Sequence, residues 1–308
     1  MTSRAASHVL LVAPFEYRTN TETADSNAFQ RAVGTAEAER LAAEAIVQHR
    51  ALRDLLIENG VRATVARSLR DTPDAPFCNN WFSTHPGAAG NRLVLYPMLA
   101  PSRRIERRPD LVAMLRAGYP EVLDFSSREL DGIFLESTGS LCLDDEARVA
   151  YATISPRTDR RLTGEWAAKM GYRLVAFTAT DGQGLPYYHT NVMMFVGHGL
   201  AGICLESIGL TAAPGETTRS EVEAALTGGG LDILPISRQQ VLEFCGNCLP
   251  LSNDLGERLL VMSSAAYQGF DGDQRARIER RARILHTDLS AFETLGGGSA
   301  RCLLGELF

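Results

Sequence analysis

The stretch AEAERLAAEAIVQHRALRDLLIENGVRATVAR, residues 36–67, joins a helical pattern directly to a strand-like one. Apolar residues recur at helical spacing through its first part: Leu41, Ala45, Ile46, Leu52, Leu55 and Leu56. Gly60 then ends the helix, and VRATVAR follows as a short strand. The apolar run HVLLVAPF, residues 8–15, precedes this stretch. The whole region therefore predicts a strand–helix–strand unit.

Four more segments repeat this order with little sequence identity. Their leading strands begin near positions 92, 148, 202 and 258, in steps of about 55 residues, the scale on which propellers and arrays repeat. The predicted helices lie within residues 107–119, 157–171, 215–229 and 271–289. Plain βαβ winding into an open sheet is the alternative. Five similar units with short strands between them fit a five-bladed α/β propeller better, and because no Pro/Ser-rich linker divides the chain, we predict one domain, residues 1–308.

The bulk composition is that of an ordinary globular enzyme, with 45% hydrophobic and 22% charged residues. A net charge of -6 and a pI near 5.6 argue against a general nucleic-acid binder, which needs a basic face. No apolar run approaches the roughly 20 residues of a membrane span. No basic segment and cleavage site flank the short apolar run at residues 8–15. We therefore expect a cytoplasmic protein.

Six cysteines are present, and only Cys245 and Cys248 form a CxxC pair, in FCGNC. A zinc site would need a second CxxC or a histidine pair, and neither follows. We interpret the pair as two small apolar residues, with a zinc or redox module as a minor alternative. Cys302, at the end of GGGSARC (296–302), is the other cysteine of interest. On its own it is more typical of a buried residue than of a nucleophile.

The segments left outside the repeating pattern follow strands at comparable points in successive units: 73–85, 101–108, 135–145, 155–159, 187–194 and 296–302. In a ring of five units, such loops converge on the axis at one end. Loops positioned by a rigid scaffold commonly carry binding and catalytic residues. These six segments are therefore where a site is expected.

Cysteine catalysis needs a base within hydrogen-bond reach and a third group that orients the base. His189 is the best of the six histidines, because it lies on a Gly/Pro/Tyr-rich turn before an apolar strand. Glu136 ends an apolar run, where a carboxylate is costly unless it is paired. It would orient a histidine, bind a cationic nitrogen or accept backbone N–H bonds. Arg104 and Arg157 come directly after strand ends and suit bidentate recognition of a carboxylate.

Assembled, the motifs NNWFSTH, LESTGS, YHTNVMM, FCGN and GGGSARC resemble those of the guanidino-group-modifying enzymes. This pentein-fold superfamily contains arginine deiminases, dimethylarginine dimethylaminohydrolases and amidinotransferases. The resemblance covers nearly the whole chain, and it is closest to bacterial amidinotransferase-like proteins associated with citrulline hydrolysis. APSRR and SPRT also resemble segments of the dimethylargininases. The resemblance implies the five-bladed fold and a reaction that uses no metal or organic cofactor.

The resemblance also implies roles for individual residues. Cys302 would be the nucleophile, His189 the general acid/base and Glu136 the third catalytic acid. Arg104 and Arg157 would bind the α-carboxylate of the substrate. These roles describe a hydrolase that passes through a covalent Cys302 intermediate.

In the resemblance to deiminases, asparagines occupy positions at which the deiminases bind the substrate guanidinium. Asn80, with Asn79 beside it, lies where deiminases carry a guanidinium-binding carboxylate, and Asn191 lies where they carry a second aspartate. A buried cation requires carboxylate partners, whereas an amide offers one donor and one acceptor to a neutral ureido group. We therefore expect citrulline to be hydrolysed to ornithine, ammonia and carbon dioxide.

The alternatives are an arginine deiminase, a dimethylarginine dimethylaminohydrolase-type hydrolase or an amidinotransferase. A non-catalytic pentein, such as the ribosome anti-association factors, is the alternative outside the enzymes. The expected partner is a small amino-acid substrate, without nucleic acid or membrane, and a homodimer is left open. Ser137 stands where a glycine is usual after the glutamate, and Cys78 lies two residues before Asn80.

Overall fold

The computed structural model describes residues 5–87 and 90–308 and has an α/β fold of five three-stranded sheets. In every sheet a central strand pairs in parallel with one neighbour and antiparallel with the other. The central strands are β1 (His8–Ala13), β4 (Arg92–Leu95), β7 (Val149–Thr153), β10 (Leu200–Ile203) and β13 (Arg258–Ser263). Their first residues confirm the predicted spacing of the repeating units.

The parallel neighbours are β2 (Arg62–Arg67), β5 (Glu121–Asp124), β8 (Arg173–Phe177), β11 (Asp232–Pro235) and β14 (Arg283–Thr287). The antiparallel neighbours are β15 (Gly305–Glu306), β3 (Phe82–His85), β6 (Cys142–Asp144), β9 (Met194–Gly197) and β12 (Leu249–Ser252). Since β15 pairs with β1, the end of the chain completes the first sheet. The turn that precedes β15 is thereby fixed beside the start of the chain.

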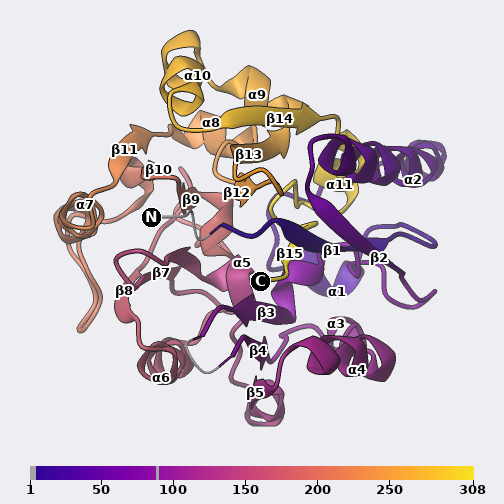
Figure 1. Ribbon diagram of the computed structural model, residues 1–308, viewed down its shortest axis with the longest axis horizontal. Helices are drawn as coiled ribbons and strands as arrows, with labels where there is room; N and C mark the ends of the chain where they lie inside the picture. Colours follow the sequence, from indigo (N-terminus) through magenta and orange to yellow (C-terminus); the bar gives the residue numbers. More distant parts are fainter. Residues whose placement is uncertain (1–4, 88–89) are drawn as a thin grey trace.

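The connection from each central strand to its parallel neighbour contains one longer helix, because a parallel pair requires a crossover. These helices are α2 (Thr35–Glu58), α4 (Pro109–Gly118), α6 (Arg160–Met170), α7 (Arg219–Gly228) and α10 (Gly272–Glu279). Figure 1 shows them outside the sheets, which follow one another around a common centre in chain order. Local sequence sets their ends: for example, the Asp159 side chain caps α6, and Gly171, at φ +71, ends it.

Shorter helices lie in the connections. They are α1 (Thr21–Ala24), α3 (Pro101–Arg104), α5 (Ser137–Ser140), α8 (Arg238–Leu242), α9 (Ser264–Gly269) and α11 (Ser290–Leu295). Four 3₁₀ turns accompany them: η1 (Cys78–Asn80), η2 (Ser126–Asp131), η3 (Thr190–Val192) and η4 (Leu205–Ser207). Several of these short elements carry the polar side chains described below.

The helix predicted over residues 271–289 is wrong in its second half. Helix α10 ends at Glu279, and β14 takes over at Arg283. Consecutive residues Ile284 and Leu285 contact two different hydrophobic clusters, which requires the alternating faces of a strand. The charged residues after Glu279 continue a helical pattern in sequence, and only pairing with β13 reveals the strand.

The hydrophobic core lies between neighbouring sheets. Trp166 on α6, for example, is fully buried in a cluster that includes residues of both β4 and β7. Its indole N–H donates a hydrogen bond to the hydroxyl of Tyr96 at 2.8 Å, so the ring is buried and its N–H still has a hydrogen-bond partner. Within residues 5–87 and 90–308, none of the helices combines the length and apolarity that crossing a membrane requires.

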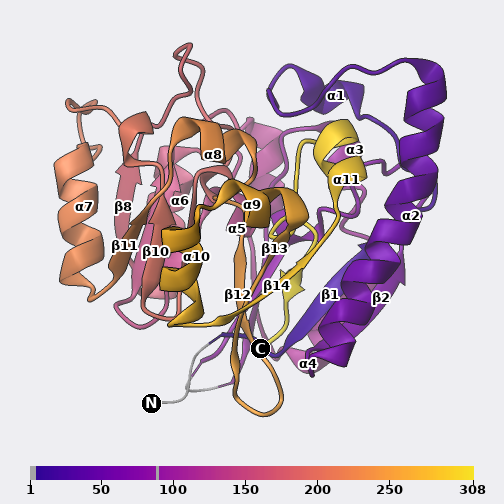
Figure 2. The same ribbon diagram turned by 90° about the horizontal axis from the view of Figure 1, so that it is seen from above.

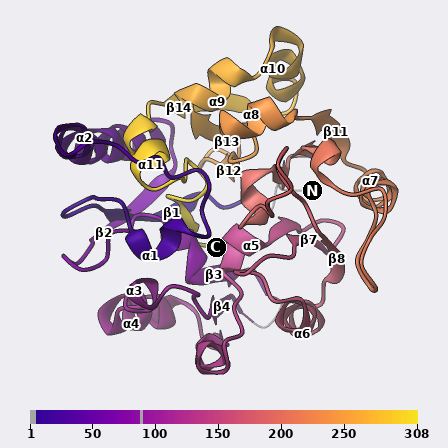
Figure 3. The ribbon, with the colours of Figure 1, turned by 180° about the vertical axis from the view of Figure 1, so that it is seen from behind.

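The short helices gather at one end of the molecule. Figure 2 shows α1, α3 and α11 at the end opposite to the C-terminus. Figure 3, from behind, shows α1 and α5 close to the centre of the ring of sheets. Three of the predicted loops contain or follow α3, α5 and α11, namely residues 101–108, 135–145 and 296–302. This end is therefore where the candidate site is found.

Candidate active site

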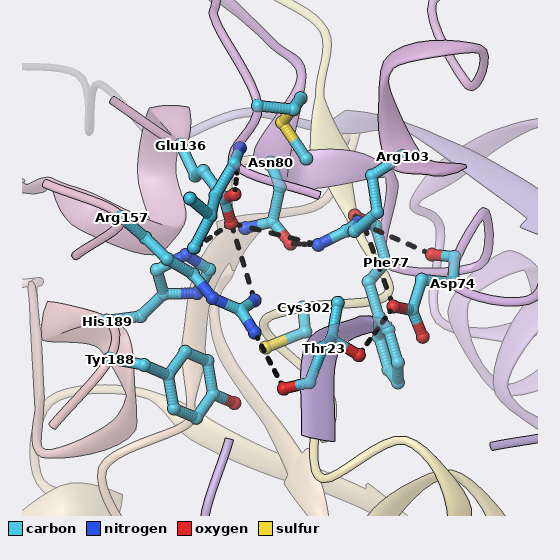
Figure 4. A network of polar contacts seen from close by, with 12 residues as sticks. Thr23, Asp74, Phe77, Asn80, Arg103, Glu136, Arg157, Tyr188, His189 and Cys302 are labelled. Carbon is cyan, nitrogen blue, oxygen red and sulfur yellow. Dashed lines mark hydrogen bonds and ion pairs between the residues drawn. The ribbon is translucent and has the colours of Figure 1, made fainter. Parts of the chain in front are cut away.

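A small enclosed cavity at this end is lined by residues from distant parts of the chain: Asn27, Asp74, Phe77, Asn80, Arg103, Arg157, Tyr188, His189, Gly296, Gly298 and Cys302. Figure 4 shows that Cys302, His189 and Glu136, from three of the predicted loops, lie together. A non-catalytic binding protein would have no reason to place a thiol and an imidazole in one cavity. The arrangement therefore favours an enzyme.

Glu136 immediately precedes α5 and is completely buried. Its Oε2 lies 2.8 Å from Nε2 of His189 and 3.5 Å from Nη1 of Arg157. Its Oε1 accepts a hydrogen bond from the backbone N–H of Leu99 at 3.0 Å. Burial alone would raise the pKa of Glu136, but the neighbouring Arg157 and His189 outweigh burial and hold the pKa well below its usual range. All three partners considered for this carboxylate occur together.

His189 directly precedes η3 and is buried. Burial lowers the pKa of His189 to about 4, although the hydrogen bond to Glu136 acts in the opposite direction. A neutral imidazole that donates its Nε2–H to an ionised carboxylate keeps the lone pair on Nδ1. The contact with Glu136 therefore sets the tautomer that a general base needs.

Cys302 lies at the end of the glycine-rich loop 296–302, in a turn where its backbone N–H donates to Ser299 at 3.0 Å. Gly297 adopts φ +61, a conformation that favours glycine. A Cβ at Gly296 would lie 2.5 Å from the ring of Phe77, so this backbone approaches the ring more closely than other residues allow. Cys302 thus belongs to a tight turn before β15 and not to a strand.

The thiol of Cys302 is 3% exposed. Burial raises its pKa, and donors and cations around it act in the opposite direction. The amide Nδ2 of Asn247 lies 3.3 Å from Sγ, and Nδ2 of Asn191 lies 3.8 Å away. Arg301 and Arg103 supply the nearby positive charge. Such surroundings stabilise the thiolate of Cys302 more than a purely apolar pocket would.

Arg157, predicted to bind a carboxylate, does line the cavity. Its guanidinium stacks over the ring of Tyr188, with 4.8 Å from Cζ to the ring centroid. Nη2 donates to the hydroxyl of Ser26 at 2.7 Å. The Arg157 guanidinium therefore contacts the Glu136 carboxylate, the Tyr188 ring and Ser26, which follows α1.

Arg104 does not line the cavity, and its neighbour Arg103 does. The Nε of Arg104 donates to the carbonyl of Met98, and its Nη2 donates to Leu99. Arg103 is buried and donates from Nε and Nη2 to the two carboxylate oxygens of Glu106, at 2.9 and 3.0 Å. Consecutive residues on a helix point about 100° apart, so only one of the pair can face the cavity.

The three predicted asparagines are buried but differ in position. Asn80 lines the cavity and accepts a hydrogen bond from Arg103 at 2.9 Å, whereas Asn79 donates to Thr138. Asn191 contacts Cys302 and also lines a second cavity on the far side. Side-chain atoms Asn80 Nδ2, Asn79 Oδ1 and Asn191 Oδ1 have no hydrogen-bond partner among the described residues.

The glycine of LESTGS allows this close packing. A Cβ on Gly139 would lie 2.7 Å from Nδ1 of His189 and still closer to Asn80. The preceding Ser137 has φ +46, a left-handed conformation that glycine adopts more easily. The substitution noted at Ser137 therefore falls where glycine would be favoured, and its hydroxyl donates to the carbonyl of Phe82 at 2.7 Å.

Sequence analysis missed Asp74 and the segment 20–27. Asp74 lines the cavity, and its Oδ2 accepts hydrogen bonds from Asn20 at 2.9 Å and Thr23 at 3.2 Å. Its Oδ1 has no partner among the described residues. Asp74 lies in the non-periodic segment 73–85, which was a usable signal. The segment 20–27 lies within the resemblance from residue 22 onward, but no local pattern assigned it to the site, because its contacts are made only after folding.

The remaining cysteines have partners away from this cavity. Cys245 donates to the carbonyl of Ala266, Cys248 donates to that of Cys245, and Cys78 contacts the carbonyl of Leu10. Burial raises the pKa of Cys78 to about 12. Among residues 5–87 and 90–308 no cluster of His, Cys, Asp and Glu suits a metal ion.

Solved structures share the fold at low sequence identity. The N-terminal domain of ArgZ, bound covalently to a reaction intermediate, has a TM-score of 0.74 and 16% identity, over 98% of this chain and 97% of that domain. Full-length ArgZ is described as an arginine dihydrolase from cyanobacteria, and this chain covers 40% of it. An adduct of dimethylarginine dimethylaminohydrolase has a TM-score of 0.66 and 15% identity, over 98% of this chain and 100% of the other.

Sequence comparison gives the family. No curated protein sequence matches the chain. The family model described as N,N dimethylarginine dimethylhydrolase, eukaryotic, matches residues 13–308, which include every candidate site residue. The chain therefore belongs to this family of N,N dimethylarginine dimethylhydrolases, within the pentein superfamily of guanidino-group-modifying enzymes.

Proposed function

We propose that this protein hydrolyses the ureido group of citrulline through a covalent intermediate on Cys302, giving ornithine, ammonia and carbon dioxide. The five sheets act as the blades of one closed propeller, a single catalytic domain. The loops at one end of the propeller build the site. Cys302, His189 and Glu136 carry the chemistry in this proposal.

The proposal of citrulline as the substrate rests on side-chain atoms near Cys302 that have no hydrogen-bond partner among the described residues. Asn80 lines the cavity and offers the N–H groups of its amide, and Asn191, which contacts Cys302, has an unpartnered carbonyl oxygen. A ureido group presents one acceptor oxygen, which the amide of Asn80 satisfies without burying a net charge. A guanidinium would place a cation against these amides, while Glu136 is already paired with Arg157 and His189.

The amino-acid end of the substrate has its own partners. Arg103 and Arg157 are buried guanidinium groups that line the cavity and suit a carboxylate. The unpartnered Oδ1 of Asp74 suits an α-ammonium group. Together these residues favour an α-amino acid over a simple urea.

In the first step, the proton of the Cys302 thiol passes to Nδ1 of His189, and Sγ bonds to the ureido carbon. The tetrahedral intermediate collapses as the bond from this carbon to the δ-nitrogen breaks. His189 returns its proton to that nitrogen, so ornithine leaves and a carbamoyl thioester remains on Cys302. Glu136 stabilises the imidazolium that exists between the two transfers.

In the second step, His189 takes a proton from water, and the hydroxide adds to the thioester carbon. The carbon–sulfur bond breaks, the thiol is restored with the proton from His189, and carbamic acid decomposes to ammonia and carbon dioxide. General acid–base assistance of this kind contributes roughly 10²–10⁴-fold.

Substrate entry requires movement of segment 20–27. The enclosed cavity has about 10 Å³ of free space, roughly that of one water molecule. Thr23 contacts Asp74, and Ser26 accepts a hydrogen bond from Arg157. Displacing this segment would free the two groups assigned to the amino-acid end.

The test is the product formed from each substrate. The protein should convert citrulline to equal amounts of ornithine and ammonia, and mass spectrometry of quenched reactions should find a carbamoyl group on Cys302. Cys302→Ala should abolish turnover, while Cys78→Ala, which alters another buried cysteine, should retain it. Ornithine formation that survives Cys302→Ala would reject the mechanism.

Hydrolysis of a guanidino substrate is the second candidate, favoured by the match to the dimethylarginine dimethylhydrolase family. The same residues would then release ammonia or an alkylamine and leave citrulline. Arginine and dimethylarginine assayed beside citrulline separate the two. Citrulline that accumulates from either substrate and is not consumed would reject the ureido proposal.

A further inference from the structure

The FCGNC motif remains without a role after the CxxC interpretation is set aside. It forms the connection between α8 and β12, and two features show that its path is constrained. Phe244 adopts φ +61, which is rare for a bulky residue. A Cβ on Gly246 would collide with the backbone of Val192 and Met193, so the loop packs directly on the turn that follows His189. Backbone constraints of this kind often cluster at functional sites.

This path brings Asn247 to the nucleophile. Its Nδ2 lies 3.3 Å from Sγ of Cys302 and donates a second hydrogen bond to the carbonyl of Asn191 at 2.9 Å. Its Oδ1 accepts a hydrogen bond from the backbone N–H of Arg301 at 3.0 Å. The side chain is 1% exposed. Every polar atom of this amide is therefore used, and one N–H is directed at the thiol.

The orientation of the amide follows from its fixed partners. The backbone N–H of Arg301 is a donor, so the atom facing it must be the oxygen of Asn247. The carbonyl of Asn191 is an acceptor, so the atom facing it must be the nitrogen. The nitrogen therefore faces Cys302 as well. An N–H directed at sulfur stabilises a thiolate more than a thiol.

We propose that Asn247 is a further catalytic residue, whose Nδ2–H donates a hydrogen bond to the Cys302 thiolate and so stabilises and directs the nucleophile. This role rests on the proposed function of Cys302 as the nucleophile, and it holds for either a ureido or a guanidino substrate. Asn247 also ties Cys302 to Asn191, because one amide group contacts both. The turn that carries Cys302 and the turn that follows His189 are thus held in fixed relation.

Other groups also act on this sulfur. The charged and titratable neighbours are Arg103, Arg301, His189, Tyr17, Tyr188 and Cys142. The arginines favour the thiolate by charge, and they remain in place in every variant below. A change that follows substitution of Asn247 alone is therefore attributable to its hydrogen bond.

The experiment titrates Cys302 without substrate. The ultraviolet absorbance of the thiolate is followed against pH, and the same titration of the Cys302→Ser variant is subtracted. This measurement is repeated in Asn247→Ala, in Asn247→Asp, which preserves shape and the bond from Arg301, and in Cys248→Ala. The last is a matched control, because Cys248 is buried in the same loop and bonds to Cys245 instead of Cys302.

The pH midpoint of the Cys302 thiolate titration should rise by about one unit in Asn247→Ala, which is a roughly tenfold loss of thiolate at a given pH. It should rise further in Asn247→Asp, because a carboxylate repels the thiolate, and should stay unchanged in Cys248→Ala. Turnover should fall through kcat with little change in KM. A merely structural role would lower the thermal midpoint without moving the titration.

Two results would overturn the proposal: an unshifted midpoint in both folded Asn247 variants, or no thiolate signal from Cys302 at any pH where the parent is folded. Citrulline turnover is measured separately. A shifted midpoint in a protein that does not turn over citrulline would support the role of Asn247 while rejecting the substrate.

Discussion

Two buried glutamates beside the cavity, one near the reacting end and one near the amino-acid end of the proposed substrate, have opposite electrostatic character. At the reacting end, Glu136 contacts Arg157, His189 and a backbone N–H, and its pKa is held well below the usual range despite burial. At the amino-acid end, burial raises the pKa of Glu106 to about 7, although Arg103 binds both of its oxygens. Neighbouring carboxylates add to this rise at Glu106.

The difference shows that burial by itself does not determine the charge of a carboxylate. Glu136 has more donors and cations around it, so it stays ionised and can stabilise an imidazolium. Glu106 has one guanidinium, which it shares with Asp74 and Asn80. In the proposed mechanism the first carboxylate stabilises the imidazolium of His189, whereas the second binds Arg103, and substitutions at each end should have different kinetic signatures.

The largest effect is expected at the reacting end. Glu136→Gln should lower kcat on the preferred substrate by about 10²–10⁴-fold, because a neutral amide no longer stabilises protonated His189. Steady-state kinetics measures the change, and circular dichroism with thermal unfolding checks that the variant is folded. A kcat within about tenfold of the parent would place Glu136 outside the catalytic machinery.

At the amino-acid end, Arg103→Lys should raise KM by about 10- to 100-fold with a small change in kcat, because a bidentate charged contact to the substrate carboxylate is lost. Arg104→Lys is the matched control, since Arg104 bonds to backbone carbonyls outside the cavity. Its KM should stay within about twofold of the parent. Equal effects of the two substitutions would contradict the assignment of Arg103.

The third effect concerns stability and its pH dependence at Glu106. A carboxyl whose pKa is raised on folding, here from 4.5 to about 7, contributes stability that is present below 4.5 and is lost as the pH rises through 7. Glu106→Gln should remove this loss, so its free energy of unfolding should fall by about 3 kcal/mol less than that of the parent across this window.

Denaturant unfolding at a series of pH values measures this difference between parent and variant. His189 titrates in an overlapping range with the opposite sign, because its pKa is lowered to about 4. Its contribution is common to both proteins and cancels. Parallel curves for parent and Glu106→Gln would show that Glu106 is ionised like Glu136, and the contrast between the two ends would disappear.

Much of the fold can be predicted from the sequence, because each repeating unit has its own pattern of strand and helix residues. The start of β4 at Arg92 and the glycine turn at Gly297 follow from local residue choice. The end of α10 does not, because the charged residues after Glu279 suit a helix as well as they suit the edge of β14. Pairing with β13 decides between them.

The candidate site divides in the same way. The motifs indicate Cys302, His189 and Glu136, and the tertiary structure places them together. Sequence analysis selected Arg104 and not Arg103, because both follow the same strand, and the angle of about 100° between consecutive helical residues does not show which of them faces the cavity.

By itself, the sequence determined the repeating units, the residue types available for thiol chemistry and the asparagines on which the proposal of a neutral substrate rests. Only the tertiary structure decided which arginine faces the cavity, that Asp74 and segment 20–27 contribute to its surroundings, and that Asn247 contacts Cys302. The physical reason is that local patterns encode helices, strands and turns. Contacts between loops of different sheets depend instead on how the five sheets are placed around their common centre (Figure 1).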